Sequence, residues 1–302
     1  MLTQKTWKGE AVLRLALGVV ICICAGSLVL SGLHYVQVKG WVFSWFVPVA
    51  AGGLFCLVMS LVRLWNPWRM ERMFSPLLVF LMWLYVGLTL TFLAEKMAGP
   101  IGAQAGKVLV SMLSFQGAAV FLIRHFLREH QVDWSEAFGL KNRIVFAVLI
   151  GIIAGCVFLP VGQGLQWLSI FVMEHLPHPV KPQEQEAIQA MRSAVFWLDR
   201  GALAATAIVV APLAEEMLFR GILYPAIKNR GYPGAAMWIS AFLFALMHAN
   251  LMIFLPLLAL AILLTLLYEK TNNLMAPIAA HSLFNALNFI RLCLDERAGG
   301  IN

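Results

Sequence analysis

The chain has 302 residues, of which 61% are hydrophobic and only 12% are charged, and its mean hydropathy is +0.81. These proportions exclude an ordinary soluble domain and are typical of a protein that crosses a membrane several times. The net charge of +7 lies in short segments between apolar runs, as it does in cytoplasmic membrane flanks, so it does not indicate a nucleic-acid partner.

Apolar windows long enough to cross about 30 Å of hydrocarbon fall near residues 11–33, 41–62, 74–94, 108–124, 144–172, 194–213, 232–248, 251–268 and 272–294. They predict an all-α, polytopic transmembrane helix bundle of eight or nine spans. The count depends on Pro212, because a proline kinks or ends a helix. Residues 194–227 therefore form either one bent helix or two shorter ones.

The basic residues predict a cytoplasmic N-terminus. If the spans alternate from the inside, the inner segments carry more lysine and arginine than the outer ones, as the positive-inside rule requires. The inner set includes Arg63, Arg69, Arg72, Arg124, Arg128, Lys228 and Arg230. We expect a multi-pass protein of a bacterial inner (cytoplasmic) membrane, surrounded by the lipid bilayer.

The N-terminal half of the sequence offers no candidate site. The first four spans contain few polar residues, and the polar stretch at 124–143 reads as an inner loop with a short interfacial helix over 133–140, ending at Gly139. Residues 174–193 read as a loop or lid on the outer face. We therefore assign residues 1–143 to peripheral transmembrane helices and residues 144–302 to a catalytic core, with its motifs within 211–290.

Three charged residues interrupt the apolar stretch A-P-L-A-E-E-M-L-F-R-G, which runs from Ala211 to Gly221. A charged side chain at mid-membrane costs about 2.5–3.5 kcal/mol on insertion scales, so such residues usually have a function. Glu216 and Arg220 are four residues apart with the acid first, the favourable order for an ion pair on a helix. Glu215 points about 100° away around the helix, which leaves it without that cation.

Two further polar pairs follow at helical spacing. Phe244 and His248 are four residues apart, and so are His281 and Asn285. A carboxylate beside an imidazole can take a proton from water, while a second imidazole and an amide can donate hydrogen bonds to an oxyanion. If the three helices converge on one pocket, these residues predict a hydrolase.

Two other readings of the same residues stay open. In the first, the polar groups only hold helices together, as an ion pair and as interhelical hydrogen bonds; this reading does not explain why they gather in one stretch of the chain. In the second, Glu215, His248 and His281 hold a zinc ion that activates the water, as in a metalloprotease. The H-E-x-x-H pattern is absent, so spacing alone leaves the metal open.

The motifs E-E-M-L-F-R (from Glu215), F-A-L-M-H (from Phe244) and H-S-L-F-N (from His281) resemble those of one family of intramembrane endopeptidases. It is the CAAX prenyl protease and bacteriocin-processing family, also described as Abi-like. The resemblance covers roughly residues 194–290, with a looser echo in W-S-E-A-F-G-L before the fifth span. It implies proteolysis inside a membrane cavity of a helix bundle, with peptides or membrane proteins as substrates.

The resemblance also implies residue roles. Glu215 matches the general base, with His248 as its partner on the water, and His281 and Asn285 match the oxyanion hole. Glu216, Arg220 and Phe244 match supporting positions of the motifs. Family members have been described both as metalloproteases and as glutamic proteases, so zinc stays open here too. The alternative function is that of a non-proteolytic scaffold, immunity or regulatory member of the same family.

Overall fold

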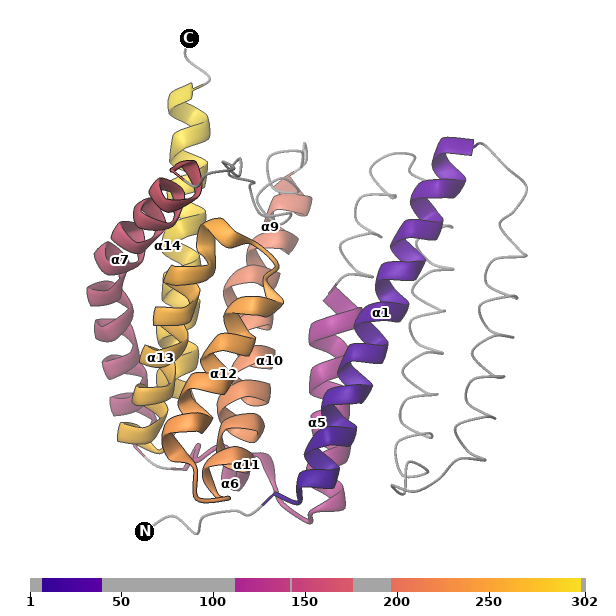
Figure 1. Cartoon of the computed structure of the whole chain (residues 1–302), viewed down its shortest axis with the longest axis vertical. Helices are drawn as coiled ribbons and strands as arrows, with labels where there is room; N and C mark the ends of the chain where they lie inside the picture. Colours follow the sequence, from indigo (N-terminus) through magenta and orange to yellow (C-terminus); the bar gives the residue numbers. More distant parts are fainter. Residues whose placement is uncertain (1–6, 40–111, 142, 176–196, 300–302) are drawn as a thin grey trace. The chain divides into compact units, whose positions relative to one another are not determined.

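The computed structural model describes residues 7–39, 112–141, 143–175 and 197–299 (Figure 1). Every regular element within these residues is helical, and none of them is a strand, which confirms the predicted all-α class. The helices are α1 (Gly9–Lys39), η1 (Leu113–Gly117), α5 (Ala118–Glu129), α6 (Trp134–Ala137), α7 (Ile144–Glu174), α9 (Trp197–Ala205), η2 (Thr206–Val210), α10 (Ala211–Glu216), η3 (Met217–Leu223), α11 (Tyr224–Lys228), α12 (Pro233–Met247), η4 (Leu251–Ile253), α13 (Phe254–Thr271) and α14 (Met275–Gly299).

Several of these helices are long and apolar enough to cross a membrane, and the protein is an integral membrane protein. The spanning stretches within the described residues are Gly9–Ser27, Ile144–Glu174, Arg200–Lys228 and Leu251–Thr271, and Pro233–Met247 is a shorter apolar helix. The predicted spans at 41–62 and 74–94 and most of the predicted outer loop lie outside the described residues. The total of eight or nine spans and the cytoplasmic N-terminus stay predictions.

The chain divides into two compact units. One consists of Lys8–His130, and the other of Met1–Trp7 together with Gln131–Asn302. All three motifs lie in the second unit. The sequence-based division at residue 143 concerns where the catalytic core begins and stays a prediction.

The unit formed by Lys8–His130 contains a buried ion-pair network that the sequence reading missed. Arg14 of α1 is only 4% exposed, and its guanidinium bonds Glu10 one turn earlier at 2.6 Å and Glu129 of α5 at 2.8 Å. A guanidinium between two carboxylates is stable in an apolar setting because each charge has a partner. The network joins α1 to α5, so this unit contains a buried polar contact even though it carries no motif.

In the motif-bearing unit, α7 packs along α14 (Figure 1). Three glycines of α7, Gly151, Gly155 and Gly162, face Ala276, Ala280 and Phe284 of α14. Small residues let two helix backbones approach closely in a membrane. This contact fixes α14 along its length, and α14 also packs against η2 and α10, so His281 and Asn285 face the helix that carries the two glutamates.

The motif helix is one continuous run from Trp197 to Lys228 rather than two helices. Two π-helical segments, η2 and η3, interrupt its α-helical register on either side of α10. In η2 the N–H of Ala211 donates to the carbonyl of Thr206, five residues earlier. Pro212 comes next and has no N–H to donate. The wider π turn therefore takes the proline into the helix without breaking it.

The predicted interfacial helix is also present, as α6. Asp133 caps its N-terminus by accepting a hydrogen bond from the Glu136 N–H at 2.6 Å, which satisfies one of the free donors of the first turn. The helix ends at Ala137, and Gly139 follows with a φ of 68°, the left-handed conformation that terminates helices. Phe138 then bonds Leu274 through its carbonyl, at 3.0 Å, which joins this turn to the start of α14.

Candidate active site

Glu215 and Glu216 are the last two residues of α10, and Arg220 lies in the π-helical η3 that follows. All three side chains are buried: Glu215 is 8% exposed, and Glu216 and Arg220 are not exposed at all. Burying charges without partners is costly, so the contacts of each group decide what it can do.

Arg220 ties η3 to two neighbouring helices. Its Nη1 donates to Glu216 Oε1 at 2.8 Å, which confirms the predicted ion pair, and its Nη2 donates to the carbonyl of Ala261 in α13 at 2.9 Å. The guanidinium also lies over the ring of Phe244 in α12, 4.7 Å from its centroid, a favourable cation–π geometry. Arg220 and Glu216 therefore form a brace between three helices.

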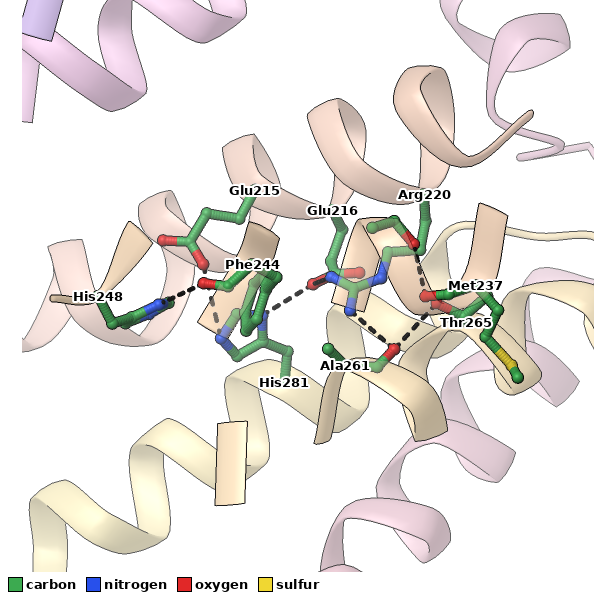
Figure 2. A network of polar contacts seen from close by, with 10 residues as sticks. Glu215, Glu216, Arg220, Met237, Phe244, His248, Ala261, Thr265 and His281 are labelled. Atoms are coloured by element: carbon green, nitrogen blue, oxygen red, sulfur yellow. Dashed lines mark hydrogen bonds and ion pairs between the residues drawn. The ribbon is translucent and has the colours of Figure 1, made fainter. Parts of the chain in front are cut away.

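His281 lies between the two glutamates, as Figure 2 shows. Its Nδ1 is 2.9 Å from Glu216 Oε1, and its Nε2 is 3.9 Å from Glu215 Oε2. Because an ionised carboxylate can only accept hydrogen bonds, Nδ1 donates to Glu216, and this contact fixes the ring with Nε2 toward Glu215. The two glutamate side chains point in different directions around their own helix, yet the imidazole of His281 in α14 faces both.

Three polar atoms of this cluster are buried without a hydrogen-bond partner within the described residues, namely Glu215 Oε2, Glu216 Oε2 and Arg220 Nε. Of these, Glu215 Oε2 is the one that faces His281 Nε2. Buried polar atoms are normally hydrogen-bonded to protein or water. A water molecule about 2.8 Å from each atom can bridge the separation of 3.9 Å between Oε2 and His281 Nε2, and such a water has the polar partners that buried waters require. The geometry suits a carboxylate that acts on water.

Phe244 and His248 enter the site from the C-terminal end of α12. Phe244 is 1% exposed and packs edge-on against Phe219 and His281, at ring-centroid distances of 5.3 and 5.6 Å. His248 is half-buried, and its Nδ1 is 2.8 Å from the Phe244 carbonyl. A carbonyl only accepts, so Nδ1 carries the hydrogen and Nε2 is left for other contacts.

Asn285 is held by a backbone carbonyl that Pro212 leaves free. Its Nδ2 donates to Ala207 O at 2.8 Å. The donor to that carbonyl in the π register would be Pro212, which has no N–H, and the neighbouring donor, Ala211, is engaged with Thr206. The bond sets the orientation of the amide and leaves its second N–H for another acceptor.

The sequence predicted one site made of Glu215, Glu216, Arg220, Phe244, His248, His281 and Asn285. The structure joins five of them through the pairs given above. Of the other two, His248 contacts Phe244 and Asn285 bonds the Ala207 carbonyl. The prediction missed Ala207 and Ala261, because a backbone acceptor has no side-chain signature in a sequence. The signal that was available for Ala207 is Pro212, since a proline within a helical pattern marks a carbonyl four or five residues earlier that loses its donor.

A zinc site finds no support in the donor geometry. Within the part of the chain that the structure describes, no group of three His, Cys, Asp or Glu side chains could hold a metal ion. The candidate ligands Glu215, His248 and His281 do not form such a group. Each of these histidines bonds a neighbour through Nδ1, the Phe244 carbonyl in one and Glu216 in the other, which leaves Nε2 as the only ring atom that could bind a metal. The residues present thus do not fit a three-ligand metal centre.

Comparisons with known proteins point to one family. The family model described as type II CAAX prenyl endopeptidase Rce1-like matches residues 197–287. The chain is 37% identical over 78 residues to "UPF0177 protein YxdF" of Lactococcus lactis, covering 26% of this chain and 42% of that protein. It is 36% identical over 78 residues to "Uncharacterized protein YpbD" of Bacillus subtilis, covering 24% and 37%. It is also 32% identical over 77 residues to "Putative membrane peptidase YdiL" of Bacillus subtilis, covering 26% and 32%.

These similarities are confined to the motif region. The chain spans less than half the length of each of these relatives, and no solved structure matches it. The segment that matches the family model includes Glu215, Glu216, Arg220, His248, His281 and Asn285. The family resemblance inferred from the sequence motifs is confirmed at this level: residues 197–287 match the Rce1-like model of type II CAAX prenyl endopeptidases, and one of the similar proteins is named as a putative membrane peptidase.

Proposed function

We propose that the protein is an intramembrane endopeptidase that hydrolyses peptide bonds with a water molecule activated by Glu215. The observation that carries the proposal is the buried Glu215 Oε2, which has no hydrogen-bond partner and lies 3.9 Å from His281 Nε2. A carboxylate positioned in this way can accept a proton from a water held between the two groups. The match of the motif region to the model of an endopeptidase family supports the same reaction class.

The division of roles follows from the charges. Glu216 is engaged by Arg220 and by His281 Nδ1, whereas Glu215 meets only the Nε2 side of the imidazole. Among the described residues, Glu216 Oε2 also lacks a hydrogen-bond partner, but Glu216 Oε1 holds both Arg220 and His281, whereas Glu215 has no such cation and its Oε2 faces His281 Nε2. We assign Glu215 as the general base and Glu216 with Arg220 as its support.

In the proposed reaction, Glu215 Oε2 takes a proton from water as the water oxygen adds to the scissile carbonyl carbon. The carbonyl oxygen becomes an oxyanion on that same carbon, so its donors must lie within a few ångströms of the base. We assign His281 and the second N–H of Asn285 as these donors, as the family resemblance implies. Glu215 then returns its proton to the leaving amine, and the C–N bond breaks.

His248 is assigned as the second partner of the water. Its Nδ1–H is held by the Phe244 carbonyl, so the free Nε2 can accept a hydrogen bond. The substrates proposed are peptides or membrane-protein segments that reach the bilayer, and the site of action is a bacterial inner membrane. Both assignments rest on the family and on the apolar spans rather than on a contact with substrate.

The alternative, a non-proteolytic scaffold or immunity or regulatory protein, accounts for part of the site. A purely structural role explains Glu216, Arg220 and Asn285, since each joins its helix to a neighbour. It explains Glu215 less well, because Oε2 makes no hydrogen bond within the protein and its ion-pair partner, His281 Nε2, is 3.9 Å away. A costly buried carboxylate that is held so loosely is better accounted for by catalysis than by packing.

The test uses the full-length protein purified in detergent and reconstituted in vesicles, with quenched-fluorescence peptides and with membrane extracts as substrates. Cleavage by the native protein and not by Glu215→Gln, followed by mass spectrometry of the product ends, supports an endopeptidase. If the native protein and the variant give the same products at the same rate, the proposed function is wrong. Comparing the membrane proteome of cells that carry either form identifies the substrates.

A further inference from the structure

A second proline interrupts the backbone hydrogen bonding of the motif helix close to another carbonyl. Pro225 is the second residue of α11 and has no N–H to donate. In an α-helical register that N–H would serve the carbonyl of Gly221, whereas in the π register of η3 it would serve the carbonyl of Arg220. Gly221 directly follows Arg220 in η3, so this interruption falls one residue from the brace of the proposed active site.

The side chain of Trp7 bonds the Gly221 carbonyl. Its indole Nε1 donates to Gly221 O at 3.3 Å, and the tryptophan is only 8% exposed. The arrangement repeats the one at Ala207, where Asn285 donates to the carbonyl that Pro212 leaves free. Each of these two prolines thus has a side-chain N–H from a distant part of the chain that bonds a nearby carbonyl.

Gly221 is also covered on its Cα side. The ring of Phe138 lies where a Cβ at position 221 would be, so only glycine fits there. Phe138 is 2% exposed and is anchored to the start of α14 by the bond between its carbonyl and the Leu274 N–H. Gly221 is therefore held through its carbonyl by Trp7 and through its Cα by Phe138.

We propose that Trp7 is a positioning residue for the active site: its indole N–H fixes the η3 turn, and through Arg220 and Glu216 it sets the orientation of His281. The proposal rests on the proposed function for its catalytic readout. The connection runs over few bonds, because Gly221 is covalently joined to Arg220, and Arg220 shares Glu216 Oε1 with His281.

The experiment compares Trp7→Phe, which keeps an aromatic ring but removes the N–H, with the native protein in vesicles. Trp167→Phe is the matched control, because Trp167 is 70% exposed on α7. The third variant, Trp7→Phe with Pro225→Ala, returns an N–H at position 225 that can donate to the Gly221 carbonyl in an α-helical register. Hydrogen–deuterium exchange of residues 217–223 is measured together with kcat and KM for a cleaved peptide.

Trp7→Phe is expected to speed exchange in 217–223 and to lower kcat by roughly three- to tenfold, the rate equivalent of one hydrogen bond, with KM unchanged. Adding Pro225→Ala should restore both measurements, and Trp167→Phe should change neither. Unchanged exchange in Trp7→Phe overturns the proposal, and so does faster exchange with an unchanged kcat, which would make the indole a structural contact only. If the native protein cleaves nothing, the proposed function fails, and the exchange measurement alone decides whether Trp7 holds this turn.

Discussion

The side-chain amide of Asn285 donates to the backbone carbonyl of Ala207, 2.8 Å away, across two helices. The pairing exists because Pro212 cannot supply the donor that this carbonyl would have in the π register. Asn285 thus joins α14 to the motif helix just before the two glutamates. The same side-chain amide therefore makes this contact with the motif helix and is assigned to the proposed oxyanion hole.

This pairing predicts an interaction between Asn285 and Pro212 in stability. Asn285→Ala leaves a partly buried carbonyl without this partner and should lower the free energy of unfolding by about 1–3 kcal/mol. In a Pro212→Ala background the restored N–H can serve that carbonyl, so the same substitution should cost less. Asn288→Ala is the control, because Asn288 bonds the Phe284 carbonyl of its own helix and Gln163 of α7 rather than the motif helix. Equal losses in both backgrounds, measured by thermal unfolding in detergent, would refute the explanation.

Glu215→Gln is expected to abolish cleavage while the protein stays folded. The variant keeps the shape of the side chain but cannot accept a proton, and a positioned base commonly contributes about 10²–10⁴ in rate. Glu215 makes no hydrogen bond through Oε2, so the melting temperature should change little. Rates and melting curves measured on the same preparation check both parts. Full activity in this variant would exclude the glutamate-base mechanism.

Glu216→Gln and Arg220→Ala should behave differently from Glu215→Gln, because they break the buried ion pair. Removing one partner of such a pair strands the other charge and commonly costs about 3–5 kcal/mol. Both variants should therefore melt at lower temperature and also lose activity, since Glu216 holds His281. Thermal unfolding read alongside cleavage separates the two glutamates. A stable, inactive Glu216→Gln together with an unfolded Glu215→Gln would show that the base and the brace are assigned in reverse.

Cleavage is expected to be insensitive to metal chelation. Of the candidate metal ligands, Glu215 and His281 lie together, but the described residues supply no third ligand beside them. In the proposed reaction, Glu215 alone takes the proton from water. Elemental analysis of the purified protein before and after treatment with a chelator, with activity assayed in parallel, provides the measurement. Stoichiometric zinc that is lost together with activity in His248→Ala would reverse this assignment.

The turn between α11 and α12 is expected to face the cytoplasm. A cysteine introduced by Asn229→Cys, in a background without the native cysteines, should be shielded from a membrane-impermeant thiol reagent in intact cells and labelled after permeabilisation. The basic residues Lys228 and Arg230 on either side motivate the prediction. Labelling of the introduced thiol in intact cells would invert the orientation of the motif helix.

Local spacing was sufficient to predict some of these features. The Glu216–Arg220 pair was predictable because its partners are one helical turn apart, and its geometry hardly depends on the rest of the fold. The different directions of Glu215 and Glu216 around their helix could also be inferred locally. That inference did not identify the side chain from another helix that contacts each glutamate. His281 comes from α14 and faces both glutamates, and only tertiary packing decides that.

The two prolines show what was present in the sequence and was not used. Pro212 left open whether the motif helix is continuous, and the structure answers this with a π turn that keeps the run intact. The side chains of Asn285 and Trp7 donate to carbonyls in the two π-helical segments, η2 and η3 respectively. A reading based on α-helical periodicity could not place them, because it assumes that each carbonyl is bonded by the residue four positions later.

The π turn at Thr206–Val210 also makes the length of this segment matter to the arrangement of the site. A π-helical segment contains one residue more than the α-helical turn it replaces, and one residue corresponds to about 100° of rotation. A related chain with intact glutamates and histidines but one residue fewer in this segment would have the upstream part of the helix rotated against the glutamates. Its Asn285 counterpart would then meet a different carbonyl. The number of residues between Ala205 and Pro212, as much as the motif letters, thus indicates which relatives share this arrangement.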